Sequence, residues 1–240
     1  RDWSSDVCSS DLEDLVRYMA RHRHHGPFEH VGLTFEVKIP MPQAVHFLRH
    51  RTGKFNQISA RYTELPSEVY LPSRREIVST SKTRKQGRDE ENSRGVSEEW
   101  QAEQLAIMQE ATTVAMSAYR KLLDNGVAPE LARLVVPQGI YTVLVCTFDL
   151  RNLMHLISLR TAKDAQAETR AYADMLRMLA EQLFPVAAPA LAKYTVDSIR
   201  LTRKQFVYLR KMGGKSLSET GLYSFSDGEE SPAELMEFLA

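Results

Sequence analysis

The chain has 240 residues, which fits one large domain or one domain with a small appendage. Hydrophobic residues make up 43% of the chain and aromatic residues 8%, enough to bury a core, and this excludes wholesale disorder. Because Lys plus Arg (31) equals Asp plus Glu (31), the bulk charge does not indicate a strongly basic nucleic-acid-binding protein.

The cysteine content and the apolar runs narrow the class of protein further. Only Cys8 and Cys146 are present, which excludes a disulfide framework and a thiolate metal site. No apolar run approaches the ~20 residues that span a bilayer, and nothing near the start has the apolar core of a signal peptide. We therefore expect a globular protein of the reducing cytoplasm without a membrane partner.

Residues 1–12, RDWSSDVCSSDL, resemble the translated read-through of a sequencing-library adapter fused in frame to a gene. Because foreign segments are set aside before fold reasoning, we take the domain to begin near Glu13. Cys8 then drops out, and we expect a native N-terminal segment to be missing. The alternative is that residues 1–12 are a natural polar tail.

In the first half of the chain, the pattern predicts a helix, a strand and a second helix. Residues 12–19 have helical apolar spacing, and residues 33–39 alternate apolar with polar, as in a half-buried strand. Pro42 suits the first turn of a helix that runs to about Arg49. Residues 52–61 are polar with an early glycine and are predicted to be a loop, and the charged residues 71–95 a mobile insertion.

In the second half, helices dominate. Residues 97–124 predict a long helix, whose apolar stripe is Met108, Ala111, Ala115, Ala118 and Leu122, closed by Asn125-Gly126. Pro129 starts a helix to Val136, residues 140–147 predict a buried strand, and Asp149 can cap a helix to about Arg160. A further helix through residues 172–183 ends at Pro185. Residues 196–240 are a weakly patterned C-terminal extension, in which Pro232 can start a last helix. Mixed elements without regular βαβ alternation favour an α+β fold.

The densest cluster of polar side chains runs from Arg49 to Arg61, RHRTGKFNQISAR. It contains four Arg or Lys residues and no carboxylate, and guanidinium groups offer planar forks that match phosphate oxygens. The segment can therefore bind phosphorylated ligands. The alternative is a solvated basic face, against which the hydrogen-bonding Asn56, Gln57 and Ser59 count, since their spacing fits no helix stripe.

Three other groups of residues can carry chemistry. His22, His24, His25 and His30 suggest zinc, but they crowd one short loop without a Cys or Asp partner at ligand spacing, so we expect no metal. Arg151 and His155 share one helix face, while Arg160 lies half a turn away from Arg151, so this helix can contact two different ligands. Arg133 lies in an apolar stretch, where a snorkelling surface arginine is the alternative.

These segments together resemble the flavin-dependent thymidylate synthases. RHRTGKFNQISAR is similar to the family signature, R-H-R-x7-S in its loose form and RHR-x-x-S-x-N-x-x-S-x-R in its fuller form. It matches the fuller form at Arg49, His50, Arg51, Asn56, Ser59 and Arg61. It departs at Lys54, where the family usually has Ser. HHGPFEH is similar to the family's H-x-[ST]-P-F-E-H segment, with Gly26 in place of Ser or Thr. PELARLVVP and DLRNLMHLISLR resemble its nucleotide-phosphate and flavin segments, so the resemblance covers about residues 20–195 in family order.

The resemblance implies an α+β domain at residues 13–195, with a curved sheet and long helices. It implies a homotetramer whose active sites are shared between subunits. The implied activity is reductive methylation of dUMP to dTMP in thymidylate biosynthesis, with FAD as cofactor, NADPH as reductant and methylenetetrahydrofolate as carbon donor. In such an enzyme the cofactor does the hard chemistry, while protein groups bind, orient and polarise. We expect dUMP and folate as small-molecule partners, and no nucleic acid.

The resemblance also implies roles for individual residues. The implied FAD contacts are His24, Glu29, Arg49, His50, Arg51, Thr52, Gln57, Asp149, Arg151 and His155. The implied dUMP contacts are His46 (where the family often has Gln), Arg49, Gln57, Ile58, Ser59, Ala60, Arg61, Arg133 and Arg160. Arg61 and Arg133 hold the phosphate. Arg160, facing the uracil ring, and Ser59 are the implied catalytic residues, because a fixed cation stabilises negative charge that develops on the pyrimidine.

Cys146 gives an independent indication. It follows the apolar run 143–145, where a thiol packs as an inert hydrophobic group, so we expect a mechanism without a cysteine nucleophile. A second function stays open: Arg49 to Arg61, with Arg74, Arg75, Lys82, Arg84 and Lys85, can form a surface for single-stranded RNA. The zero net charge and the absence of an RNA-module aromatic pair argue against that alternative.

Overall fold

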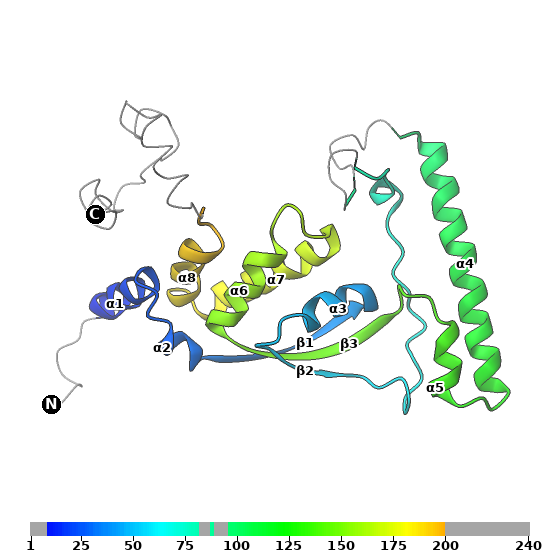
Figure 1. Ribbon diagram of the computed structural model, residues 1–240, viewed down its shortest axis with the longest axis horizontal. Coiled ribbons are helices and arrows are strands. Elements are labelled where there is room, and N and C mark those ends of the chain that lie inside the picture. Colours follow the sequence, from blue (N-terminus) through cyan, green and yellow to red (C-terminus); the bar gives the residue numbers. More distant parts are fainter. Residues whose placement is uncertain (1–8, 82–86, 89–95, 200–240) are drawn as a thin grey trace. The chain divides into compact units, whose positions relative to one another are not determined.

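A three-stranded antiparallel sheet, with strand order β1-β3-β2, organises the chain (Figure 1). The computed structural model describes residues 9–81, 87–88 and 96–199. β1 spans Gly32–Pro40, β2 spans Lys54–Gln57 and β3 spans Tyr141–Asp149. With helices packed against this sheet, the predicted α+β class is confirmed.

The central strand β3 sets the two faces of the sheet. Phe35 and Phe55 both lie opposite Cys146, on the face that packs against the helical core. On the other face the hydroxyl groups of Thr34 and Thr147 are hydrogen-bonded at 2.9 Å. The period-two pattern of residues 33–39 is therefore realised as predicted, because one face is buried and the other is polar.

The prediction of a loop at residues 52–61 is wrong in its centre, where β2 forms. Phe55 points into the core and its ring meets that of Phe148 edge to face, with centroids 5.5 Å apart. Lys54 and Asn56 point to the exposed side. Two inward side chains are too few to show a strand period in the sequence, and the pairing partner lies about ninety residues further along the chain.

Helices cover the core face of the sheet. α1 spans Ser9–Arg21, α2 Gly26–Glu29, α3 Met41–Leu48, α6 Leu150–Arg160, α7 Ala167–Leu183 and α8 Ala187–Thr195. Asp149 caps α6 as predicted, because its carboxylate accepts the Asn152 backbone N–H at 2.8 Å. The short α2 and the alanine-rich α8 were not predicted from the sequence. None of the helices in the described ranges is both long enough and apolar enough to cross a membrane.

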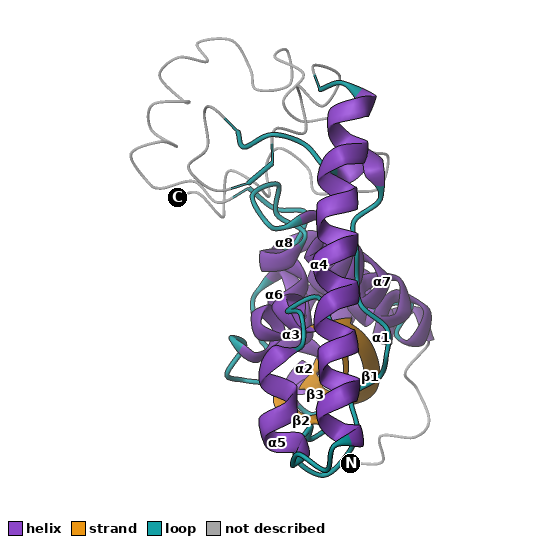
Figure 2. Cartoon of the chain, turned by 90° about the vertical axis from the view of Figure 1, so that its right-hand side faces the viewer, coloured by secondary structure: helices purple, strands orange, loops and turns teal. Residues whose placement is uncertain are grey.

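α4 (Glu98–Asp124) lies at one end of the sheet and packs against α5 (Pro129–Ala132) and η3 (Arg133–Val135) (Figure 2). Ser97 caps α4, and Gly126 ends it with a φ of 78°. Met116 and Tyr119 are buried in a second, smaller core with Ala132 and Ile140. The predicted stripe is therefore offset, because Met108 and Ala111 are exposed. The helix predicted from Pro129 to Val136 is split into α5 and the 3-10 turn η3.

The described part of the segment 71–95 makes specific contacts. It includes a 3-10 turn, η1 (Arg74–Glu76), with a capping box between Ser73 and Glu76. Arg88 forms an ion pair with Glu168 of α7, and the Tyr70 hydroxyl donates to the same carboxylate at 2.9 Å. Residues 82–86 and 89–95, and with them Lys82, Arg84 and Lys85, lie outside the described residues.

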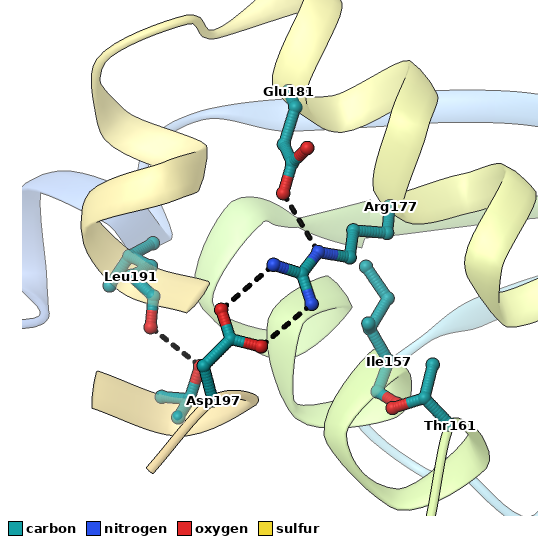
Figure 3. A network of polar contacts seen from close by, with 7 residues as sticks. Ile157, Thr161, Arg177, Glu181, Leu191 and Asp197 are labelled. Carbon is teal, nitrogen blue, oxygen red and sulfur yellow. Dashed lines mark hydrogen bonds and ion pairs between the residues drawn. The ribbon is translucent and has the colours of Figure 1, made fainter. Parts of the chain in front are cut away.

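Arg177 of α7 forms hydrogen bonds with Asp197, close to the last described residue (Figure 3). Two guanidinium nitrogens of Arg177 donate to the two carboxylate oxygens of Asp197, each at 2.8 Å. Its Nε donates to Glu181, also at 2.8 Å. Such bidentate pairs fix geometry as well as charge. One compact unit ends at Asp197. The helix predicted after Pro232 lies outside the described residues.

Candidate active site

The ends of α3 and α6 meet at Arg160. Its Nε donates to Nε2 of His50, and its Nη2 donates to the carbonyl oxygen of His46, both at 3.0 Å. The end of α6 is closed separately by the backbone N–H of Thr161, which donates to Ile157 O at 2.9 Å. Arg160 therefore does not cap its own helix; it joins α6 to α3.

This contact fixes the protonation state of His50. An arginine side chain offers only donors, so Nε2 of His50 must accept this hydrogen bond. The neutral imidazole of His50 therefore carries its proton on Nδ1. Burial, the Arg160 cation and His155 lower the pKa of His50 to about 4. His155, whose ring centroid is 6.4 Å from that of His50, is exposed. His50 is thus a neutral, oriented imidazole beside a fixed cation.

Arg160 keeps part of its guanidinium group for a ligand. Burial lowers its pKa, but a guanidinium pKa starts so high that the group stays charged at neutral pH. Nη1 donates no hydrogen bond to a described residue, whereas Nε donates to His50 and Nη2 donates to the carbonyl oxygen of His46. A partly desolvated cation held at two points, with one donor group left, suits the stabilisation of a negatively charged ring.

A second contact joins α2 to α6. Nε of Arg151 lies 3.5 Å from Oε1 of Glu29, so two of the predicted flavin contacts are neighbours. Nδ1 of His25 is buried and has no hydrogen-bond partner among the described residues. Burial, and after it Arg151, lowers the pKa of His25. His24 is exposed and its ring stacks on Tyr18 at a centroid distance of 6.3 Å.

The turn after α3 carries exposed cations. Arg49, Arg51 and Thr52 are exposed, and within the described ranges neither arginine forms an ion pair or a side-chain hydrogen bond. The guanidinium groups of Arg49 and Arg51, on either side of His50 in the chain, can therefore bind an anionic ligand such as a diphosphate. Asp149, also a predicted flavin contact, accepts hydrogen bonds from Asn152 on both of its oxygens, at 2.8 and 2.6 Å.

Gln57 and the turn that follows it are held against β3. The Gln57 amide donates to Thr142 Oγ1 at 3.1 Å, and the Ile58 N–H donates to Val143 O at 3.1 Å. The Ser59 hydroxyl accepts the Arg61 N–H at 3.3 Å. Ser59 is exposed and Ala60 half-buried, so this turn presents side chains to solvent at the end of a fixed strand.

The two predicted phosphate-binding arginines both contact Glu130, a residue that the sequence did not indicate. Nε of Arg61 donates to Glu130 at 3.0 Å, and Nε of Arg133 donates to the carbonyl oxygen of the same residue at 3.3 Å. No hydrogen bond or ion pair in the described ranges joins this pair to the Arg160 group. Within the described ranges, the predicted nucleotide contacts are therefore held by two sets of hydrogen bonds that share no residue.

The sequence did not indicate Thr169, which contacts the predicted site residue His46. Nδ1 of His46 lies 3.2 Å from the hydroxyl of Thr169, which is fully buried in the first turn of α7. The two residues are 123 positions apart, and nothing in the sequence pattern relates them.

Cys146 is a core residue, as predicted. It has no solvent exposure, and burial raises the pKa of its thiol to about 12, so the thiolate does not form at neutral pH. Lys54 is exposed on the polar side of β2, and the space around Gly26 is open. No group of three or more His, Cys, Asp or Glu residues gathers as metal ligands within the described ranges.

Comparisons with known proteins agree on one family. A family model described as "thymidylate synthase complementing protein" matches residues 2–186. Flavin-dependent thymidylate synthase from Treponema pallidum is 35% identical over 208 residues, covering 86% of this chain and 67% of that protein. The enzyme of the same name from Thermus thermophilus is 36% identical over 224 residues, 93% of this chain and 79% of that protein. A UMP/dUMP methylase from Streptomyces cacaoi, bound with 5-Br dUMP, is similar in structure, with a TM-score of 0.67 and 32% identity over 80% of this chain and 83% of that one.

Proposed function

The chain belongs to the family of flavin-dependent thymidylate synthases, and we propose that it methylates dUMP to dTMP with a bound flavin. The observation that carries this proposal is Arg160, a half-buried cation held by His50 and by the carbonyl oxygen of His46, with one donor group left. The names of the relatives support the flavin and the reaction, and the bound 5-Br dUMP of the structural relative supports the nucleotide. The RNA-binding alternative gains no support from these matches.

The flavin is FAD in this proposal. Arg49 and Arg51 would hold its diphosphate, and the neighbouring Arg151, Glu29 and His155 would contact it from α2 and α6. The buried, unpartnered Nδ1 of His25 marks a polar position in the same region. When bound, the flavin supplies redox chemistry and carries the one-carbon unit. The role of this chain's residues is to bind, to orient and to exclude water.

The nucleotide is bound by two groups of residues. Ser59, Ala60 and the Gln57–Ile58 backbone would line its base and sugar, and Arg61 and Arg133 would hold its phosphate. A dianionic phosphate competes with Glu130 for Arg61, so binding would replace one carboxylate contact by a stronger one. Arg160 would face the uracil ring and stabilise the negative charge that grows there, with His50 holding the guanidinium in place.

NADPH as reductant and methylenetetrahydrofolate as carbon donor complete the reaction in this proposal. We also propose a homotetramer in which neighbouring chains close each site. The exposed apolar side chains of α4 and α7 support this, because they suit burial between subunits; they are Ile107, Met108, Val114, Met175, Met178, Leu179 and Leu183. Light scattering tests the assembly, and an active monomer would refute it.

An absorbance titration tests the ligands directly. The purified protein should show a flavin spectrum that changes on addition of dUMP, with UMP as the matched comparison for the sugar. Arg51→Ala should lower flavin affinity, because one charge-assisted contact is worth roughly 1.5–3 kcal/mol. Arg120→Ala, on an exposed position of α4, is the control. Flavin retention by Arg51→Ala equal to that of the control would remove Arg51 from the flavin site.

A further inference from the structure

The contact between His46 and Thr169 joins α3 to α7, and the same histidine also contacts Arg160. Nδ1 of His46 and Oγ1 of Thr169 are 3.2 Å apart, and the carbonyl of His46 accepts from Arg160 at 3.0 Å. His46 is half-buried, whereas Thr169 has no solvent exposure. His46 therefore contacts Arg160 through its backbone carbonyl and the buried Thr169 hydroxyl through its ring.

The hydroxyl of Thr169 differs from those of three other threonines that lie in a helix or directly after one. Thr113, Thr161 and Thr195 each donate to the carbonyl oxygen four positions earlier, at 2.8, 2.8 and 2.6 Å. Within the described ranges, the hydrogen bond of the Thr169 hydroxyl is the one to His46. A buried hydroxyl proton needs an acceptor, and Nδ1 of His46 is the acceptor within reach.

This requirement fixes the tautomer of His46. If Nδ1 carried a proton, it would donate to Thr169, and the hydroxyl proton would be buried without an acceptor, which is costly. Nδ1 must then be unprotonated. Burial, and after it Arg160, lowers the pKa of His46, which favours the neutral ring. A neutral ring with a bare Nδ1 has its proton on Nε2.

We propose that Thr169 is a positioning residue that holds His46 in the Nε2–H tautomer, so that His46 meets the nucleotide as a hydrogen-bond donor. The group that it recognises is an acceptor, a uracil carbonyl oxygen or a phosphate oxygen. No described residue hydrogen-bonds to Nε2, so this N–H is left for a ligand. The nucleotide part of this inference rests on the proposed function, whereas the tautomer does not.

A double-mutant cycle on dUMP binding tests the inference, with Kd read from the flavin absorbance change. Thr169→Val should raise the Kd about 3- to 10-fold, the effect of one hydrogen bond. Thr169→Ser, which keeps the hydroxyl, should stay within about 2-fold of wild type, as should Thr195→Val, a matched control in α8. In a His46→Ala background, Thr169→Val should have no further effect. An equal effect in both backgrounds, or none in wild type, would overturn the proposal.

A spectroscopic measurement tests the tautomer in the unmodified enzyme, independently of whether Thr169→Val folds. In ¹⁵N-histidine-labelled protein, with His46→Gln used for assignment, the proton should be found on Nε2 of His46. A proton on Nδ1 would overturn the inference. A wild-type protein with the Nε2–H tautomer that binds flavin but not dUMP would contradict the proposed function instead, so the two failures are distinguishable.

Discussion

His50 makes the stability of this protein depend on pH in a way that the structure quantifies. The ring is 7% exposed, and its pKa is lowered to about 4 from an ordinary 6.5 by burial, by Arg160 and by His155. Between these values, the unfolded chain binds a proton that the folded chain does not. The contribution of His50 to stability is therefore fully present above about pH 6.5 and is lost as the pH falls toward 4.

The magnitude follows from the size of the shift. Each pKa unit corresponds to about 1.4 kcal/mol, so the full difference is about 3 kcal/mol, and roughly 2–3 kcal/mol is lost between pH 7.5 and 4.5. His50→Asn keeps an acceptor for Arg160 but does not titrate. Urea unfolding of both proteins at the two pH values, at one protein concentration, isolates the effect because all other groups are shared. An equal loss of stability in wild type and variant would refute the buried, neutral His50.

Three further predictions follow from single residues. Cys146→Ala should leave turnover near that of wild type and cost about 1 kcal/mol of stability, since the thiol is a buried core group; loss of activity in folded protein would contradict this. Gly139→Ala should cost about 1–3 kcal/mol in urea unfolding, because its Cβ would lie 2.7 Å from the carbonyl oxygen of Tyr70, whereas Gly32→Ala, with open space, should cost far less. Arg160→Lys should bind dUMP within a few-fold of wild type but lower the single-turnover rate about 10²–10³-fold, since a point charge cannot contact both the His50 ring and the His46 carbonyl; normal turnover would remove the catalytic role.

Local sequence patterns were sufficient where the signal is local. The strand at residues 33–39 shows its period because Leu33, Phe35 and Val37 are partly buried and Ile39 is fully buried, whereas the residues between them are exposed. α6 begins where Asp149 can cap it, and α4 begins after Ser97 for the same reason. Each of these signals lies within a few residues of the element that it predicts.

Contacts between distant segments could not be read in this way. β2 is a strand because it pairs with β3, and its short length hides the alternation of Phe55 and Gln57. α4 was predicted correctly, but its buried stripe was not, since Met116 and Tyr119 are buried by packing against Ala132 and Ile140.

In the candidate site, too, the residue types could be predicted from local sequence, whereas the contacts between distant residues could not. The residue types of the site, above all Arg160, His50 and Arg151, were evident from the motif segments. The bonds that orient them were not: the Arg160–His50 contact spans 110 positions and the Arg61–Glu130 contact spans 69. Such pairings depend on tertiary structure. The sequence alone therefore predicts which chemical groups form a site, but not the hydrogen bonds that orient them.

Formation of dTMP by the purified protein tests the central claim most directly. dUMP, methylenetetrahydrofolate and NADPH would be incubated with flavin-loaded and with flavin-stripped protein, and dTMP would be quantified by chromatography. The account predicts dTMP with the flavin-loaded protein and its loss on stripping, restored by added FAD. Equal dTMP from stripped protein, or none from folded, flavin-loaded protein that binds dUMP, would contradict it.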